Sequence, residues 1–163
     1  MQVMGHRTTI EITGAGDDAL LAEFYHLHWL DMEVAPADVR PDCRERALAF
    51  IANARRERAF AGFVVIEAGR AVGGACCHVV ERAYPAFRAA DAPVVGYVWG
   101  VYVRPASRGR GVGAALVRAC LDHLSARGCG RALLHAGGRS RPLYERIGFE
   151  PTDELAMTLT AKP

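Results

Sequence analysis

Three arginines and three glycines stand together in the stretch RPASRGRGVGAAL, at residues 104–116, between an apolar segment and an alanine-rich one. The start of a helix presents N–H groups without intrahelical partners and about half a positive charge, so it favours an anion. Glycines let the backbone approach that anion closely, and arginines add charge-assisted hydrogen bonds. The pattern therefore predicts a pyrophosphate-binding turn. Its candidate residues are Arg108, Gly109, Arg110, Gly111, Val112, Gly113 and Ala114.

Other nucleotide-binding turns fit this stretch poorly. A Walker-type P-loop ends in Gly-Lys-Ser/Thr, but the first lysine of the chain is Lys162. The dinucleotide fingerprint is also imperfect, because the glycines alternate and no acidic residue follows about 20 residues later. A glycine turn that serves packing alone is the remaining alternative, although glycine there weakens a helix without adding to a core.

The elements around this turn alternate between strand-like and helix-like stretches. Period-two runs of β-branched residues predict strands, while apolar residues at helical spacing, with Asp or Pro near the start and Gly at the end, predict helices. We expect strands at 8–12, 94–103, 131–136 and 156–160, and a hairpin over 62–80 that turns at 68–70, with Gly73 and Gly74 indicating a bulge. We expect helices at 17–32, 40–58, 112–127 and 140–149, and an exposed loop at 81–93.

Two of these stretches resemble motifs of one family. RGRGVGAAL resembles the Arg/Gln-x-x-Gly-x-Gly/Ala signature of the GCN5-related N-acetyltransferase (GNAT) superfamily, and PLYERIGFEP resembles its later motif, a short helix with a Tyr four residues before Gly-Phe. GYVWGVYVRP stands where the central splayed strand of the family should lie. The resemblance implies one mixed α/β (α+β) domain over residues 1–163. Its twisted, mostly antiparallel sheet would have six to seven strands, splayed at the fourth and fifth, and about four flanking helices.

The resemblance also implies a mechanism with acetyl-CoA as cosubstrate. In similar enzymes the pantetheine arm pairs with backbone groups of the central strand, here Val101 and Val103, and the N–H of Val101 would stabilise the oxyanion. The amine attacks directly, without an acyl-enzyme. Tyr144 matches the general acid that donates to the departing thiolate; alternatively, its ring only packs beside Ile147.

The general base is not identified by the motifs. Family members often carry a carboxylate on the central strand, at positions occupied here by Trp99 and Gly100. A primary amine near pKa 10.4 is mostly protonated at pH 7, which costs about 4.6 kcal/mol. The candidates for proton removal are Glu33, His78, Glu81 and His135, and each of these is also explained as a solvated charge or a hydrogen-bonded histidine.

The acceptor pocket of similar enzymes lies between the first helical region and the loops near the third and fourth strands. In this chain the corresponding residues are Trp29, Met32, Glu33, Tyr84, Phe87, Tyr97 and Trp99. Such an aromatic group favours a small, partly apolar amine, or else it fills the core. Three functions stay open: acetylation of a small-molecule amine, acetylation of a protein N-terminus or lysine, and acyl-CoA binding without catalysis.

Composition sets outer limits on these functions. With 163 residues, 51% hydrophobic and 23% charged, the chain has ordinary globular usage. A formal net charge of +2 argues against a dedicated nucleic-acid binder, and the absence of an apolar run or signal peptide predicts a cytoplasmic protein that does not bind membranes. The five cysteines lack C-x-x-C spacing, so we expect reduced thiols, with Cys76 and Cys77 as small core residues, and no metal site. The resemblance also allows a homodimer.

Overall fold

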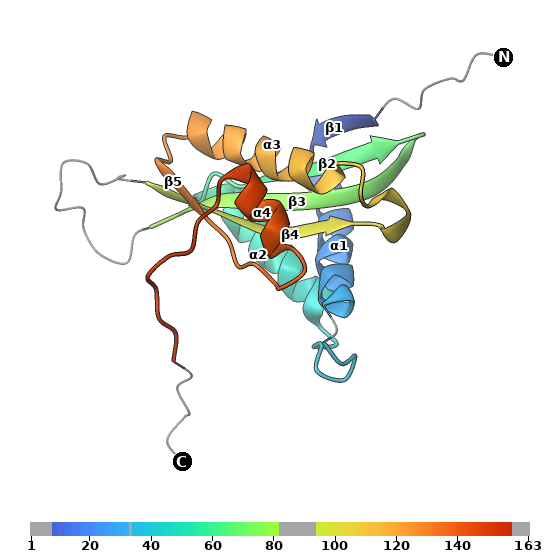
Figure 1. Cartoon of the computed structure of the whole chain (residues 1–163). Coiled ribbons are helices and arrows are strands. Elements are labelled where there is room, and N and C mark those ends of the chain that lie inside the picture. Colours follow the sequence, from blue (N-terminus) through green and yellow to red (C-terminus); the bar gives the residue numbers. More distant parts are fainter. Residues whose placement is uncertain (1–7, 33, 82–93, 158–163) are drawn as a thin grey trace.

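The computed structural model describes residues 8–32, 34–81 and 94–157, which form one α/β domain (Figure 1). The mixed α/β class predicted from the motifs is confirmed. In chain order the elements are β1 (Thr8–Ile12), η1 (Ala15–Asp17), α1 (Asp18–Asp31), α2 (Cys43–Glu57), β2 (Ala61–Glu67), β3 (Arg70–Val80), β4 (Val95–Val103), η2 (Pro105–Ser107), α3 (Val112–Ala126), β5 (Arg131–Leu133) and α4 (Arg141–Ile147).

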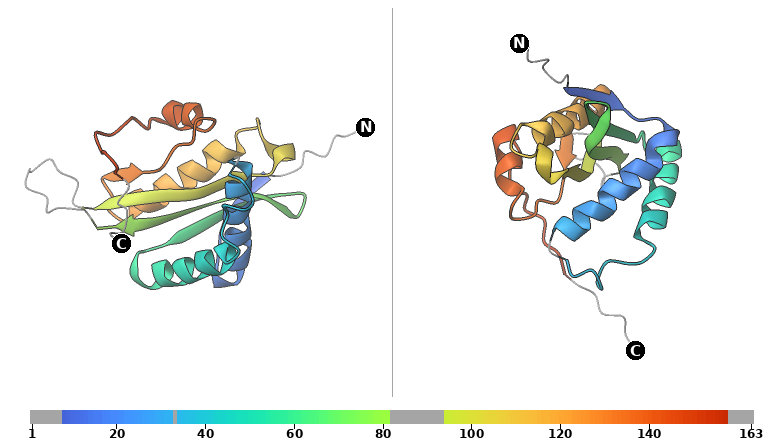
Figure 2. Two further views of the ribbon diagram at one scale, coloured as in Figure 1. Left: turned by 90° about the horizontal axis from the view of Figure 1, so that it is seen from below. Right: turned by 90° about the vertical axis from the view of Figure 1, so that its right-hand side faces the viewer.

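The sheet has five strands in the order β1-β2-β3-β4-β5. The first three pairings are antiparallel, and β5, which returns through α3, pairs with β4 in parallel. Helices α1 and α2 cover one face of this sheet, and α3 covers the other face with α4 beside it (Figure 2, left). The helices therefore bury both faces of the central strands.

Neighbouring residues of the central strands belong to different cores because side chains alternate across a strand. Val64 and Cys76 pack with Phe24 of α1 and Ile51 of α2. On the opposite face, Val65, Cys77 and Val98 pack against α3 through Leu116, Cys120 and Leu124. Cys76 and Cys77 are buried free thiols, as the sequence predicted, and Cys120 of α3 is buried as well.

Strands β4 and β5 separate soon after they meet. Their parallel pairing covers Val95–Tyr97 against Arg131–Leu133. Beyond Tyr97, β4 keeps β3 as its neighbour, and the pairings Cys76↔Trp99 and Gly74↔Tyr102 place one extra residue on β4. Gly100 takes a φ of +62° at this bulge, a conformation that glycine adopts without strain. The bulge and the splay leave one side of β4 open.

Some expected elements differ from the structure. The described part of the chain has five strands rather than six to seven. Residues 156–157 of the expected last strand have no regular structure, and residues 158–160 lie outside the described ranges. The strand expected at 131–136 ends at Leu133, and its side chains are half-buried or exposed, because β5 is an edge strand rather than an interior one. The expected loop lies outside the described residues except for Glu81.

The predicted hairpin turn and the predicted bulge are both present in the structure. The turn between β2 and β3 falls at Ala68 and Gly69, inside the predicted 68–70. The pairings Val65↔Gly73 and Ile66↔Ala71 leave one extra residue on β3, beside the glycine pair that indicated a bulge. Glycine is also needed at position 74, because a Cβ there would lie 2.8 Å from the Phe24 ring.

Candidate functional site

A cleft of about 1050 Å³ opens where β4 and β5 separate. Its walls are the last turn of α1, the outer half of β4, the arginine-glycine turn, the first turn of α3, and the loop and helix that follow β5. The splay creates this space, because a fully paired β5 would fill it. Of the predicted coenzyme-binding residues, Val101, Val103, Arg108, Gly109, Gly111, Val112, Gly113 and Ala114 line the cleft.

The N-terminus of α3 forms one end of the cleft. Gly111 is the N-cap residue with a φ of +82°, and no side chain caps the helix. The N–H of Ala115 donates to the carbonyl of Gly111, so the amides before it have no intrahelical acceptor. A Cβ on Gly109 or Gly111 would meet nothing within 4 Å, so positive φ rather than crowding explains glycine at both positions. This end of the cleft suits a diphosphate.

Arg108 lies along the wall of the cleft. Its Nε donates to the carbonyl of Val103 at 2.8 Å, and its guanidinium carbon lies 5.8 Å from the centre of the Tyr102 ring. Its terminal nitrogen donates to Asp31 Oδ2 at 2.9 Å. The guanidinium is therefore held in place by three groups and faces the cleft.

Arg110, also predicted to bind the coenzyme, does not line the cleft and pairs instead with Glu67. Its terminal nitrogen donates to Glu67 Oε2 at 2.7 Å, and the hydroxyl of Ser107 donates to the same oxygen at 3.1 Å. It is absent from the residues that line the cleft. Glu67 thus anchors the turn to the end of β2, and Arg110 serves the shape of the turn.

His28 on α1 reaches the open side of β4 and was not found by sequence reasoning. It lines the cleft and makes a hydrogen bond with the backbone of Val101. Burial lowers the pKa of His28, and the Val101 bond and Asp31 raise it by less. His28 and Asp31 are spaced i, i+3 at the end of α1, which places both on one face. This spacing is the one feature of the sequence that could have indicated His28 as a site residue.

Tyr144 is buried on α4 and lines the cleft from the side opposite β4. Its ring meets that of Phe149 edge to face, with centres 5.9 Å apart. Burial raises the pKa of Tyr144, and a hydrogen bond with Ser140 lowers it by less. The phenol is therefore protonated at neutral pH and available as a donor.

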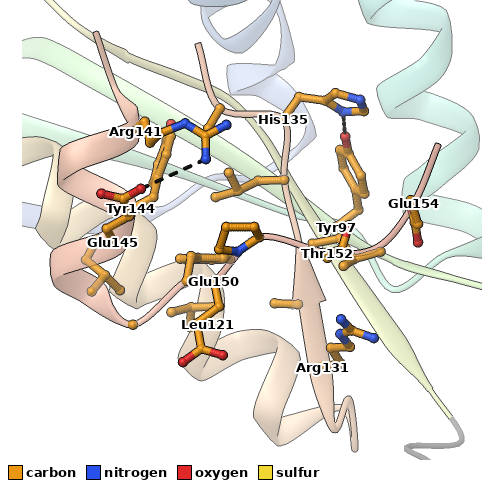
Figure 3. A pocket seen from close by; sticks show the side chains of 18 of the residues that line it. Tyr97, Leu121, Arg131, His135, Arg141, Tyr144, Glu145, Glu150, Thr152 and Glu154 are labelled. Atoms are coloured by element: carbon orange, nitrogen blue, oxygen red, sulfur yellow. Dashed lines mark hydrogen bonds and ion pairs between the residues drawn. The ribbon is translucent and has the colours of Figure 1, made fainter. Parts of the chain in front are cut away.

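A second cavity, of about 730 Å³, lies on the other side of Tyr144. Figure 3 shows Tyr144 from α4, Tyr97 from β4 and His135 after β5 around it. The hydroxyl of Tyr97 contacts His135 Nδ1, and Arg141 pairs with Glu145 across one turn of α4. Tyr144 borders both cavities.

The predicted acceptor residues divide into several groups. Trp29 packs edge to face on Tyr25, and Tyr25 packs in the same way on Trp99, which belongs to the partly buried rim of a core cluster. Met32 instead lines the cleft between β4 and β5. Tyr97 and His135 lie at the second cavity. Glu33, Tyr84 and Phe87 fall outside the described residues.

The predicted bases do not gather at the cleft. The indole N–H of Trp99 donates to His78 Nδ1 at 3.1 Å, and burial, followed by the charge of Arg58, lowers the pKa of His78 to about 4. His78 is thus a neutral acceptor inside an aromatic cluster. Glu81 is exposed after the end of β3. None of the predicted bases that lie within residues 8–32, 34–81 and 94–157, namely His78, Glu81 and His135, lines the cleft.

The described residues hold neither a metal cluster nor a membrane span. Within the described ranges, no group of three or more His, Cys, Asp or Glu side chains is arranged to hold a metal ion. No helix in the same ranges is long and apolar enough to span a bilayer.

Comparison with known proteins places this geometry in a family. The acetyltransferase (GNAT) family model matches residues 21–149. The chain is 33% identical over 104 residues to glucosamine 6-phosphate N-acetyltransferase of Trypanosoma brucei brucei, covering 63% of this chain and 67% of that protein. It is 40% identical over 63 residues to mycothiol acetyltransferase of Rhodococcus jostii, but covers only 21% of that protein.

Solved structures agree with the family model. A GCN5-related N-acetyltransferase from Ralstonia eutropha superposes with a TM-score of 0.79 and 25% identity, over 94% of this chain and 99% of that one. A predicted acetyltransferase from Clostridium acetobutylicum, solved with acetyl-CoA, superposes with a TM-score of 0.81 at 19% identity and shows the shared fold. The chain therefore belongs to the acetyltransferase (GNAT) family and is an acetyl-CoA-dependent acyltransferase.

Proposed function

We propose that this chain transfers the acetyl group of acetyl-CoA to a primary amine of a small molecule, by direct attack in a ternary complex. The observation that carries the proposal is the cleft between β4 and β5, with the uncapped start of α3 at one end and the Tyr144 phenol in its wall. A small-molecule acceptor is supported by the printed name of the trypanosomal relative, a glucosamine 6-phosphate N-acetyltransferase.

Binding is assigned to two parts of the cleft. The amides of Val112, Gly113 and Ala114 and the guanidinium of Arg108 would hold the diphosphate, because all of them face the same space. The N–H groups of Val101 and Val103 would meet the pantetheine arm along the side of β4 where β5 no longer pairs, since Arg108 already occupies the Val103 carbonyl. The thioester supplies an activated acetyl group, so the protein has to orient it and stabilise the charge that develops.

Three groups would then act on the reacting atoms. The N–H of Val101, presented at the Gly100 bulge, stabilises the negative charge on the carbonyl oxygen. Tyr144 donates a proton or a hydrogen bond to the departing sulfur. His28 accepts the proton of the amine, because it borders the cleft beside Val101 and burial keeps its ring uncharged at neutral pH.

The test of the proposed function is release of thiol from acetyl-CoA in the presence of a panel of amines. The panel contains small-molecule amines, a peptide with a free N-terminus and a lysine peptide with a blocked N-terminus. We expect turnover on small amines above that on either peptide. Preference for a peptide would replace the substrate class, and tight coenzyme binding without turnover on any amine would favour a non-catalytic coenzyme-binding module.

The role of His28 is tested by the pH dependence of turnover for the wild type and His28→Gln. The base must be unprotonated, and the folded pKa lies below 6.5, so wild-type activity is expected to fall as the pH drops through that lowered pKa. Glutamine keeps a donor for the Val101 backbone but cannot accept the proton. We expect about a hundredfold loss of turnover in the variant, together with loss of this acidic limb. An unchanged limb would leave His28 with a positioning role only.

A further inference from the structure

The carboxylate of Asp31 lies between two arginines that come from different parts of the chain. Asp31 Oδ2 accepts a hydrogen bond from Arg108 at 2.9 Å and lies 3.7 Å from a terminal nitrogen of Arg139. The same nitrogen of Arg139 donates to the backbone carbonyl of Asp31. The last residue of α1 thus joins the turn before α3 to the loop before α4.

All three residues line the cleft. Their side chains are partly exposed, at 37% for Asp31, 38% for Arg108 and 66% for Arg139. Arg108 is fixed by Val103 and the Tyr102 ring, and so keeps its position without Asp31. Among the contacts of the described residues, Arg139 is supported by Asp31 alone, through its carboxylate and its backbone carbonyl. The pair is therefore one fixed and one adjustable guanidinium.

A single oxygen shared by two guanidinium groups is an arrangement that also suits a phosphate. Arginine forks match the geometry of carboxylate and phosphate alike. A phosphate monoester carries about −1.5 to −2 charges at pH 7 and three acceptor oxygens, and a diphosphate linkage carries about one charge on each phosphate, whereas a carboxylate carries one charge in all. An incoming phosphate would therefore compete well with Asp31 for both arginines.

We propose that Asp31 holds the place of a ligand phosphate between Arg108 and Arg139, and that a phosphate group entering the cleft displaces it. The inference rests on the proposed function, because the ligand belongs to the acetyl-transfer reaction. Displacement removes the carboxylate link between α1 and Arg108, while Arg139 keeps its hydrogen bond to the Asp31 backbone carbonyl. The phosphate comes either from the coenzyme or from a phosphorylated acceptor, and the experiments below separate the two.

The first experiment is calorimetric titration of wild type and Asp31→Asn with coenzyme A and with pantetheine, which lacks phosphate. The variant keeps the shape of Asp31 and removes its charge. If the coenzyme is the source, we expect coenzyme A to bind about threefold more tightly to the variant, because an exposed competing ion pair is gone, and pantetheine to bind equally to both. If Asp31 only braces the two arginines, coenzyme A binds more weakly to the variant.

The second experiment measures the KM of glucosamine 6-phosphate and of glucosamine for the same two proteins. If the acceptor is the source, Asp31→Asn lowers the KM of the phosphorylated amine about threefold, leaves that of glucosamine unchanged and does not change coenzyme A affinity. Should neither phosphate ligand bind more tightly to the variant, the inference is overturned.

Arg139→Gln provides the complementary change, with Arg141→Gln as its matched control. Arg141 is also exposed, pairs with Glu145 and lines the second cavity rather than the cleft. We expect Arg139→Gln to weaken the phosphate-bearing ligand about tenfold relative to its phosphate-free partner, as expected for one charge-assisted hydrogen bond, and Arg141→Gln to change neither. Equal effects of the two variants would contradict the proposal.

Measurements on the wild-type protein distinguish failure of this inference from failure of the proposed function. A wild-type protein that turns over amines, combined with an Asp31→Asn variant that binds both phosphate ligands no better, leaves the function standing and removes the inference. A wild-type protein that binds no coenzyme A removes both. Circular dichroism of each variant checks that the fold is kept.

Discussion

Burial sets the protonation state of the side chains around the cleft. It raises the pKa of Tyr144, which keeps the phenol as a donor, and it lowers the pKa of His28 and His78, which keeps both rings neutral. Which of the two neutral histidines could accept a proton depends on its hydrogen-bond partners. His78 already accepts a hydrogen bond from Trp99, whereas His28 borders the cleft beside Val101.

Tyr144→Phe should lower turnover without a matching loss of coenzyme affinity. The ring and its packing against Phe149 remain, and only the proton donor is removed. We expect about a hundredfold lower kcat, the lower end for general acid catalysis, because a thiolate leaves readily and is helped by a hydrogen bond alone. Steady-state kinetics and calorimetry with coenzyme A give the two values. If the Tyr144→Phe variant turned over at the wild-type rate across the pH range, Tyr144 would be a packing residue only.

His78 should make the protein less stable in mild acid. The folded pKa of about 4 lies below the unfolded value near 6.5, so between these values the unfolded chain binds a proton that the folded one does not. The contribution of His78 to the free energy of unfolding is therefore present at pH 7 and is lost as the pH falls from about 6.5 towards 4. Relative to His78→Gln, we expect the wild type to lose between about 1 and 2 kcal/mol from pH 7 to pH 5 in urea titrations. Parallel pH curves would contradict this.

Helix α3 carries a glycine with positive φ at each end, and only one of them faces the cleft. Gly111 has a φ of +82° at the start, and Gly128 has a φ of +78° just after the end. A Cβ at either position meets nothing within 4 Å. The two glycines share a backbone requirement but differ in whether they border the proposed diphosphate site.

Gly111→Ala and Gly128→Ala form a matched pair for testing that site. Each should cost about 1 kcal/mol of unfolding free energy, because alanine is strained at positive φ. Only Gly111→Ala should also weaken coenzyme A, by about tenfold, because its methyl group and any backbone shift lie at the amides that face the phosphates. Calorimetry and urea titration measure the two effects. Equal coenzyme affinity in both variants would remove the diphosphate from this end of the cleft.

Local sequence signals predicted the elements well because they act over a few residues. The glycine after α3, the proline at the start of α4 and the turn at Ala68 each determine structure in their own neighbourhood. The glycine turn before α3 was predicted for the same reason. The shortened β5 was not, because its length depends on where β4 departs from it and not on its own residues.

Contacts between side chains far apart in the sequence could not be predicted from the sequence. Arg110 looked available for phosphate, yet Glu67 of β2 holds it. His28 belonged to an apolar helix pattern, and its position beside Val101 depends on how α1 packs on β4. Pairs separated by more than 40 residues follow from the tertiary arrangement, which periodicity and motifs do not specify.

At the opposite end of α1, a largely buried ion pair connects α1, α2 and the segment after β1. Arg55 of α2 donates to Asp18 of α1 at 2.6 Å, to the Thr13 hydroxyl at 3.1 Å and to the Gly14 carbonyl at 3.0 Å. Its guanidinium carbon also lies 4.8 Å from the centre of the Phe60 ring. One side chain thus connects both helices of that layer to the segment after β1.

Asp18→Asn should destabilise the fold without affecting the cleft. The side chain of Asp18 is 13% exposed and that of Arg55 is 23% exposed, so removing the charge leaves a poorly solvated guanidinium. We expect a loss of about 2 kcal/mol in unfolding free energy. Asp42→Asn is the control, because that exposed carboxylate pairs with Arg40 and Arg46 at the surface and should contribute little. Equal stability of both variants in urea titrations would contradict the role of the pair.

The splay that opens the cleft also gives β4 an unpaired edge inside the molecule. Unpaired strand edges can template association with other chains and so favour aggregation. Here the edge is interrupted twice, by the Gly100 bulge and by Arg108, which occupies the Val103 carbonyl. An invading strand would meet a bulge and an occupied carbonyl, so this edge is a poor template for strand addition although β5 leaves it unpaired.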